Sequence, residues 1–401
     1  MKNVAILGFG VVGGGVAKLI NDNGEQIKTL INDEVNVKLI LDLRDFPDSP
    51  YADRVVHDFA LIEKDEDIDT VIEVMGGSHP AYEYTVRALR SGKNVISSNK
   101  EVVANFGDEF LTLAKEMGLS YRFEAAVGGG IPVISPIINC VRHNKIKEVR
   151  GILNGTTNYI LTKMFTYGDS FDSALKDAQA KGYAESNPDA DILGIDASRK
   201  IAILAALATG KLVSVDKIAT EGITGIRAND VKAADRLGRS IKLLGRCIVN
   251  EDKSPYITVA PFLLGEDCPL AKVNGVYNAI EVSGEPVGNV MFFGPGAGGG
   301  ATASAVIGDL VQQYTSGDNM IRPVFNKTDF DAKECLKAFS TKYYIALPLG
   351  SEDKVRSVFD GVTFISDIEE CAFITEELTE GEVNARLDKA GLNPLSKIRF
   401  L

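Results

Sequence analysis

The sequence has few of the residues that bind zinc or form disulfides. Its three histidines, at positions 57, 79 and 143, share no metal-ligand spacing with cysteine, which argues against a zinc site. Its five cysteines are scattered and no C-x-x-C pair occurs, a pattern typical of reduced thiols rather than of a disulfide framework. We therefore expect a cytoplasmic protein.

Long apolar runs and an excess of positive charge are also absent. No apolar stretch reaches the roughly 18 residues needed to cross a membrane, and no basic signal segment opens the sequence, so we expect no membrane partner. The net charge of −12 argues against a nucleic-acid partner. With 401 residues, 45% of them hydrophobic and 24% charged, the chain is typical of a globular protein of two or three domains.

The first twenty residues carry a glycine pattern in the context that binds a dinucleotide. A short apolar strand, Val4–Leu7, runs into G-x-G-x-x-G and then into a segment with helical periodicity. Glycines there allow a tight turn and let the backbone approach a pyrophosphate at the helix N-terminus. The predicted cofactor contacts in this loop are Gly8, Phe9, Gly10, Val11, Val12 and Gly13.

Asp42 follows the second predicted strand, Val35–Leu41. An acid at this place can accept hydrogen bonds from the adenosine ribose, which favours NAD slightly over NADP. Arg44 or Arg54 could instead accept a 2′-phosphate, so both NAD(H) and NADP(H) stay open.

Strands and helices alternate from here to about residue 125, which predicts an α/β fold with a doubly wound parallel sheet of the Rossmann type. Predicted strands at Thr70–Val74 and Asn94–Ser97 end beside Gly76 and Lys100. Ligands bind beyond the carboxyl ends of such strands, so both residues are candidate cofactor contacts. We expect Lys100 in a loop, since the next predicted helix is Glu109–Met117, which a predicted strand, Ser120–Ala125, follows.

The stretch 181–200 holds the most informative charges. Asp196 and Lys200 are four residues apart, so they share one face of a helix predicted to start near Ile192. An exposed ion pair would be the simplest explanation. We expect Leu193, Leu204 and Leu207 to continue that face, however, and a lysine among leucines can have a lowered pKa and exchange protons. Lys200 is thus a candidate acid/base, with Asp196 and Glu185 as anchors for a cationic substrate group.

Two further glycine-rich stretches precede helices. In 124–136 the glycines suit a hinge or close backbone packing, and the Glu124 carboxylate with the carbonyls of Val127, Gly129 and Ile131 could alternatively hold a hard cation. The second stretch, 294–310, predicts a helix that returns to the nucleotide domain and closes the cofactor cleft.

The rest of the chain predicts two smaller units. We expect residues 1–133 and about 296–320 to form the dinucleotide-binding domain. Residues 134–295 would form an α+β catalytic and dimerisation domain whose mixed sheet pairs with another subunit. A polar linker, 321–340, would lead to 341–401, where the order β-α-β-β-α-β predicts a ferredoxin-like unit.

In order and spacing, six motifs make the chain resemble homoserine dehydrogenases over nearly its whole length. The motifs are GFGVVGGGV (8–16), SSNKEVVA (97–104), EAAVGGGIPVISP (124–136), NGTTNYIL (154–161), KGYAESNPDADILGIDASRKIAIL (181–204) and GPGAGGGATASAVIGDL (294–310). The resemblance implies reversible reduction of L-aspartate 4-semialdehyde to L-homoserine by NADH or NADPH, in the biosynthesis of threonine and methionine, by a homodimer or homotetramer.

The resemblance also implies roles for individual residues. Lys200 would give the proton to the developing alkoxide, and Lys100 would lie beside the reacting carbonyl. Substrate contacts are implied for Glu185, Asp196, Tyr183 and Thr157. Cofactor contacts are implied for Gly76, Gly182 and Gly298, and a sodium site for Glu124, Val127, Gly129 and Ile131.

Residues 341–401 resemble a short ACT regulatory domain, but the turn that begins at Pro348 lacks the acid-rich glycine loop of such domains. Amino-acid effector binding and a structural role are therefore both open. Two other functions are open as well. A phosphorylating aspartate-semialdehyde dehydrogenase needs a thiolate, and its one candidate, Cys140, lies in an apolar helix pattern typical of a core residue. A non-catalytic NAD sensor would not need the lysine and carboxylate cluster.

Overall fold

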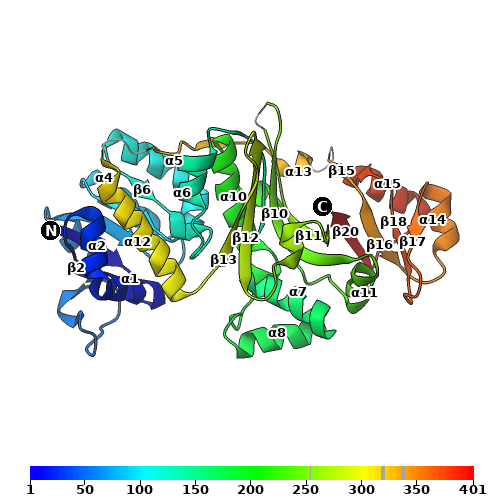
Figure 1. The fold of residues 1–401 in the computed structure, drawn as a ribbon, viewed down its shortest axis with the longest axis horizontal. Helices are drawn as coiled ribbons and strands as arrows, with labels where there is room; N and C mark the ends of the chain where they lie inside the picture. Colours follow the sequence, from blue (N-terminus) through cyan, green and yellow to red (C-terminus); the bar gives the residue numbers. More distant parts are fainter. Residues whose placement is uncertain (253, 318–320, 336–338) are drawn as a thin grey trace.

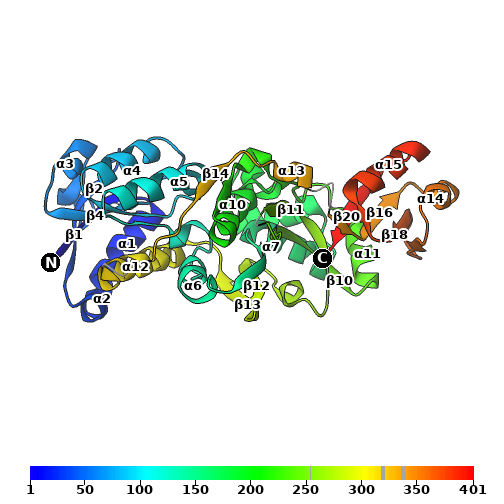
Figure 2. The ribbon, with the colours of Figure 1, turned by 90° about the horizontal axis from the view of Figure 1, so that it is seen from above.

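The computed structural model describes residues 1–252, 254–317, 321–335 and 339–401. The molecule is elongated, with a first sheet near the N-terminus, a second sheet in the middle and the C-terminal helices α14 and α15 at the far end (Figures 1 and 2). Parts of the predicted segments 296–320 and 321–340 lie outside the described residues.

Within the described residues, the first sheet has six parallel strands in the order β3-β2-β1-β4-β5-β6, which confirms the Rossmann-type prediction. The strands are β1 (Lys2–Leu7), β2 (Val35–Leu41), β3 (Val55–Val56), β4 (Ile68–Glu73), β5 (Asn94–Ser97) and β6 (Tyr121–Arg122). Side chains alternate between the two faces of this sheet. Val4 and Ile6 pack on one layer of helices, whereas Ala5 and Leu7 pack on the other.

Helices cover both faces of this sheet. They are α1 (Val11–Asp22), α2 (Gly24–Ile31), α3 (Phe59–Glu63), α4 (Ala81–Arg90), α5 (Lys100–Glu116) and, from much later in the chain, α12 (Gly299–Thr315). Ala303, Val306 and Leu310 of α12 share a core with Val16 of α1. The predicted return of this helix to the nucleotide-binding part is therefore confirmed.

The second sheet is mixed, as predicted. Its path runs β13-β12-β7-β10-β11-β20-β16-β18-β17, with β9 paired to β11. The strands before the C-terminal region are β7 (Lys145–Ile152), β9 (Ala219–Thr220), β10 (Arg239–Val249), β11 (Pro255–Gly265), β12 (Tyr277–Glu285) and β13 (Gly288–Pro295). The helices of this part are α6 (Ile134–Pro136), α7 (Gly155–Tyr167), α8 (Phe171–Ala180), α9 (Asp189–Ile192), α10 (Ile195–Thr209) and α11 (Ala228–Arg236). Helix α10 packs between this sheet and α5, so it stands where the two halves of the molecule meet.

The C-terminal region has the predicted β-α-β-β-α-β order. Its main elements are β16 (Tyr343–Leu347), α14 (Glu352–Val358), β17 (Thr363–Phe364), β18 (Cys371–Ile374), α15 (Glu380–Ala390) and β20 (Ser396–Phe400). Two short strands that were not predicted, β15 (Ser340–Thr341) and β19 (Leu378–Thr379), pair antiparallel with each other. The neighbour order β20-β16-β18-β17 places the last strand beside the first. Strand β20 also pairs in parallel with β11, so this region continues the second sheet.

The segment predicted as a polar linker is partly structured. Strand β14 (Asn326–Thr328) pairs in parallel with β8 (Lys211–Val213), and α13 (Ala332–Cys335) follows. The backbone N–H of Asn326 also donates to Gly210 O at 2.8 Å. The sequence prediction missed this pairing because three polar residues carry no strand periodicity.

Three predicted boundaries near the functional residues are wrong. Helix α5 begins at Lys100, not at Glu109, because the Asn99 side chain caps it by accepting from Val102 N. The helix expected from Ile192 is interrupted at Gly194, whose φ of +80° separates α9 from α10 and leaves Leu193 exposed. The strand expected over 120–125 ends at Arg122, where a 3₁₀ turn takes over.

Candidate active site

Asp196 and Lys200 form a buried ion pair on α10. One helical turn separates them, and Lys200 Nζ lies 2.8 Å from Asp196 Oδ2. Each side chain is 8% exposed, so the pair is no ordinary surface ion pair. The same ammonium donates to the carbonyl oxygen of Leu153, just after β7, at 2.7 Å. Two fixed acceptors therefore orient Lys200.

A second lysine reaches the same carboxylate from the other half of the molecule. Lys100, the first residue of α5, places its Nζ 2.9 Å from Asp196 Oδ1. The Asn154 side-chain amide donates to Asp196 Oδ2 at 3.0 Å and to Asp191 Oδ1 at 2.7 Å. Asp196 thus holds two ammonium groups together, and Asn154 joins it to a second carboxylate.

The two lysines have opposite pKa shifts. Burial lowers the pKa of Lys200, the nearby charge of Lys100 lowers it further, and Asp196 opposes both effects. Asp196 raises the pKa of Lys100, which is nearer to solvent. Burial alone would raise the pKa of Asp196, but the two ammonium groups keep it below its usual value. Lys200 is therefore the lysine that gives up a proton more readily, and its role as acid/base stays a prediction.

The ammonium group of Lys200 has a hydrogen-bond donor to offer a substrate. An ammonium group carries three N–H donors, and Lys200 uses two of them on Asp196 and Leu153. Among the described residues no acceptor takes the third, which can therefore donate to the oxygen of a bound substrate. A fixed ammonium group with a lowered pKa can stabilise and protonate an oxygen that gains negative charge.

A cavity of about 460 Å³ lies at the carboxyl ends of β1, β2 and β4. Four predicted cofactor residues line it: Gly8, Gly10, Asp42 and Gly76. Gly8 has a φ of +93°, which favours glycine. A Cβ on Gly13 would lie 2.0 Å from the carbonyl oxygen of Gly8, so only glycine allows this turn to close. This is the close approach expected of a dinucleotide-binding loop.

Asp42 is fixed at one wall of this cavity. Its carboxylate accepts from Phe9 N at 2.7 Å and from Arg44 Nε and Nη2, each at 3.0 Å. The Arg44 hydrogen bonds keep the pKa of Asp42 well below its usual range. Arg44 itself is 63% exposed, and besides Asp42 its guanidinium group contacts the ring of Phe46, 5.1 Å from the ring centre.

The sequence interpretation missed Glu73, a fully buried carboxyl group at the end of β4. Its oxygens accept from Met75 N at 2.9 Å and from Ser97 Oγ at 2.6 Å. Burial raises the pKa of Glu73 to about 7. The group ties the turn after β4 to the end of β5. An acid inside the apolar run TVIEV was the available signal.

Comparisons with known proteins agree with this geometry. The family model described as "Homoserine dehydrogenase, NAD binding domain" matches residues 8–124, and the one described as "Homoserine dehydrogenase" matches 132–311. A homoserine dehydrogenase of Synechocystis sp. is 42% identical over 77% of this chain and 72% of its own length. One from Bacillus subtilis is 37% identical over 90% of this chain and 86% of its own length.

The chain belongs to the homoserine dehydrogenase family.

Two solved homoserine dehydrogenases match the whole chain in fold, and a third matches part of it. The structure from Thiobacillus denitrificans has a TM-score of 0.89 and 32% identity, covering 100% of this chain and 98% of that one. A Staphylococcus aureus homoserine dehydrogenase has a TM-score of 0.83 and 30% identity, with the same coverage. A hyperthermophilic archaeal homoserine dehydrogenase mutant in complex with NADPH scores 0.66 at 30% identity, covering 78% of this chain and 98% of that one. The resemblance inferred from the motifs is confirmed, and members of this family are NAD(P)-dependent oxidoreductases.

Other residues predicted for the substrate site lie around the cluster in different ways. Thr157 is buried in the first turn of α7 and donates through its backbone N–H to Asn154 Oδ1. Tyr183 is 43% exposed, and its carbonyl oxygen accepts from Thr156 Oγ1 at 2.6 Å. Glu185 is exposed, and no described contact ties its carboxylate to Lys200. Its role stays a prediction.

The remaining predicted cofactor residues are placed less uniformly. Val11 is 80% exposed at the start of α1, and a Cβ on Gly299 would lie 2.4 Å from its Cγ1. This brings Gly298, the N-cap of α12, next to the first glycine loop. Gly182 has a φ of +73° after α8 and does not line the 460 Å³ cavity, so its cofactor contact stays a prediction.

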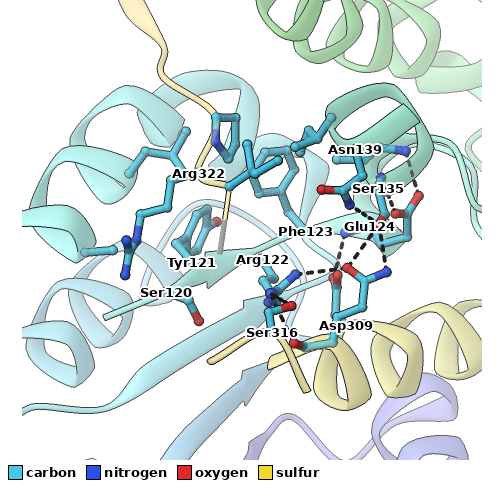
Figure 3. Close-up of a pocket in the computed structure, with 17 residues that line it drawn as sticks. Ser120, Tyr121, Arg122, Phe123, Glu124, Ser135, Asn139, Asp309, Ser316 and Arg322 are labelled. Atoms are coloured by element: carbon cyan, nitrogen blue, oxygen red, sulfur yellow. Dashed lines mark hydrogen bonds between the residues drawn. The ribbon is translucent and has the colours of Figure 1, made fainter. Parts of the chain in front are cut away.

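Glu124 is buried and already holds backbone donors. Its carboxylate accepts from Val133 N, Ile134 N and Ser135 N at 2.6–2.8 Å. Figure 3 shows Glu124 beside Ser135. Burial raises the pKa of Glu124, and these three N–H groups oppose the rise. The glycines next to it do pack closely: a Cβ on Gly129 would lie 2.4 Å from Gly296 O. The expected close backbone packing is therefore present, and the cation site stays a prediction.

A separate cavity of about 120 Å³ is lined in part by Glu124 (Figure 3). Arg122 donates across it to the side chains of Gln312 and Gln313. Asp309 accepts from Glu124 N at 2.8 Å, and burial together with the Glu124 charge raises its pKa to about 7. None of the residues that line this cavity belongs to the Lys200 cluster or to the cofactor cavity.

Cys140 is exposed in the π-helical turn 137–141, so its predicted place in the core is wrong. The turn winds more widely than an α-helix, which shifted the face expected for this side chain. The comparisons support neither the thiolate enzyme nor the NAD sensor. In the part of the chain that the structure describes, no helix is long and apolar enough to cross a membrane.

Proposed function

We propose that this protein reversibly reduces L-aspartate 4-semialdehyde to L-homoserine, with Lys200 as the proton donor to the carbonyl oxygen. The observation that carries the proposal is the buried Lys200–Asp196–Lys100 cluster, whose central carboxylate fixes both ammonium groups. A bound nicotinamide would supply or accept the hydride. The protein's own residues need to bind and orient the substrate and the cofactor, and to move one proton.

Each residue of the cluster has a task in this proposal. In the reduction, Lys200 donates the proton from its free N–H as negative charge grows on the oxygen. In the oxidation, neutral Lys200 takes the hydroxyl proton. Lys100 adds a second positive charge beside the carbonyl. Asp196 acts mainly by orienting both lysines, because its two oxygens already accept from Lys100, Lys200 and Asn154.

The substrate's α-ammonium group needs a carboxylate of its own. We keep Glu185 as a candidate, with Tyr183 and Thr157 as further contacts. We add Asp191, which is bonded to Asn154 and whose pKa burial raises. A free ammonium group would offset the cost of burying that charge.

We propose that NAD(H) is slightly preferred over NADP(H). Asp42 is held at the cavity wall with its carboxylate charged, which suits ribose hydroxyls and repels a 2′-phosphate. The similar archaeal mutant in complex with NADPH indicates that the family can bind the phosphorylated cofactor. Release of Arg44 from Asp42 would supply a partner for that phosphate.

A sodium ion fits the carbonyl-rich turn after Glu124. No described residue donates a hydrogen bond to the carbonyl oxygens of Val127, Gly129 or Ile131, although Val127 and Ile131 are buried. Buried carbonyl oxygens without donors are suitable ligands for a hard cation. Thermal unfolding in sodium chloride and in choline chloride tests this site, with a higher unfolding temperature expected in sodium.

The assembly and the domain roles remain proposals as well. We propose that 1–133 with about 296–320 binds the dinucleotide, and that 134–295 binds substrate and forms a homodimer or homotetramer. Exposed Tyr277, Met291 and Phe293 on β12 and β13 support that surface. The scattered free thiols support a cytoplasmic location.

For 341–401, the parallel pairing of β20 with β11 through Phe262–Arg399 and Leu263–Phe400 supports a structural role over an independent ACT-like effector domain. Addition of threonine to the homoserine oxidation assay tests the effector role, since an effector domain that binds threonine should inhibit the reaction.

The experiment that tests the function follows homoserine oxidation at the nicotinamide absorbance, with NAD and NADP in parallel. Turnover with a higher kcat/KM for NAD is expected. Absence of turnover with both cofactors in folded protein would contradict the proposal.

A further inference from the structure

Helices α5 and α10 are joined by a second ion pair that the reaction chemistry does not use. Glu101 Oε2 lies 2.8 Å from Arg199 Nη2. Glu101 follows Lys100 on α5, and Arg199 precedes Lys200 on α10. Both side chains are a little over one quarter exposed, 28% and 27%. Two neighbouring pairs of opposite polarity therefore connect the two helices.

The other carboxylate oxygen of Glu101 faces the cofactor side. Ser78 Oγ donates to Glu101 Oε1 at 2.6 Å. Ser78 lies in the turn between β4 and α4, two residues after Gly76, which lines the 460 Å³ cavity. The Asn99 side chain fastens the same turn by donating to Gly77 O at 2.7 Å. One carboxylate thus bonds the cofactor turn and the helix that carries Lys200.

We propose that Glu101 and Arg199 are positioning residues that couple the cofactor turn to Lys200. The proposal rests on the dehydrogenase function above, in which the cofactor supplies the hydride and Lys200 supplies the proton. Neither residue touches the reacting atoms. Misplacement by about 1 Å can cost about 100-fold in rate, whereas a partly exposed ion pair adds at most about 1 kcal/mol to folding. Loss of the pair should therefore affect catalysis far more than stability.

The variants separate the two bonds of Glu101. Arg199→Met breaks the ion pair but keeps Ser78 bonded, so kcat should fall 10- to 100-fold with little change in the KM for NAD. Ser78→Ala removes only the bond to the turn and should raise that KM. Glu101→Ala removes both bonds and should show both effects. Adding Arg199→Met to Glu101→Ala should change nothing further, since the partner is already gone.

A charge exchange gives the sharpest readout. The double variant Glu101→Arg with Arg199→Glu restores an ion pair of reversed polarity, and it should recover part of the kcat lost in each single variant. The matched control is Arg386→Met, which breaks the Arg386–Glu376 pair in the C-terminal region, where the arginine is also 27% exposed. That variant should keep native kcat. Thermal unfolding of each variant confirms that it is folded.

The dissociation constant of NAD, measured without homoserine, keeps this test independent of the proposed reaction. Glu101→Ala and Ser78→Ala should each weaken NAD binding three- to tenfold, even if the native protein failed to oxidise homoserine. Folded Arg199→Met and Glu101→Ala that keep kcat and NAD affinity within twofold of native would overturn the proposal. So would a charge exchange that recovers nothing.

Discussion

Lys100 reaches across from the first sheet's domain to place its ammonium group 2.9 Å from Asp196 Oδ1, on a helix of the other half of the molecule. The opposite oxygen of that carboxylate binds Lys200 at 2.8 Å. The position of Lys200 therefore depends on contacts from both halves. Changes to this carboxylate should alter the chemistry of Lys200 before they alter the fold.

Asp196→Asn should move the pH dependence of the reaction to lower pH. Burial and Lys100 lower the pKa of Lys200, and the Asp196 charge opposes them, so removing that charge lowers the pKa further. Homoserine oxidation needs neutral Lys200, so its kcat/KM rises as the pH rises through this pKa. The reverse reduction needs the ammonium form of Lys200, so its kcat/KM falls over the same pH range. Both limbs of the kcat/KM profiles should shift to lower pH, and an unchanged or oppositely shifted profile would contradict the assignment.

Gly13→Ala should impair the cofactor loop, whereas Gly14→Ala should not. A Cβ at Gly13 would lie 2.0 Å from Gly8 O, so the backbone must move. A Cβ at Gly14 meets no described atom within 4 Å, and alanine favours the helix by about 1 kcal/mol. Calorimetric titration with NAD and thermal unfolding compare the two variants. Equal affinities would show that the tight turn is not needed for binding.

Asp42→Ala should change which cofactor is used. The substitution removes the carboxylate that accepts from Phe9 N and releases Arg44 toward a 2′-phosphate. The KM for NADH should rise more than the KM for NADPH, by roughly tenfold in their ratio for a charged hydrogen bond. A constant ratio of the two kcat/KM values would remove Asp42 as the determinant of cofactor choice.

The sequence predicted most of the fold because its signals are local. Glycine spacing, buried strand patterns and the four-residue separation of Asp196 and Lys200 need no knowledge of distant residues. It missed the start of α5, since Asn99 caps that helix through a side chain whose partner could not be seen. It also missed the pairing of β20 with β11 and of β14 with β8, which join segments more than one hundred residues apart.

The sequence predicted only the part of the site that depends on local spacing. Lys200 and Asp196 lie on one helix, so their contact follows from spacing. Lys100, Asn154 and Asp191 meet them only through the tertiary fold, and the sequence interpretation did not select Asn154 or Asp191 as site residues. Glu73 and Glu101 were missed because their partners lie on neighbouring elements.

Comparison of native protein with Lys200→Met tests whether Lys200 exchanges the proton with the substrate oxygen. Homoserine oxidation is followed at the nicotinamide absorbance for native protein and Lys200→Met, with NAD binding measured on the same samples. Lys28→Met, which breaks an exposed ion pair with Glu34, is the control. Lys200→Met should lose kcat by roughly 100- to 10,000-fold and keep its affinity for NAD. A folded Lys200→Met with kcat near native would contradict this role of Lys200.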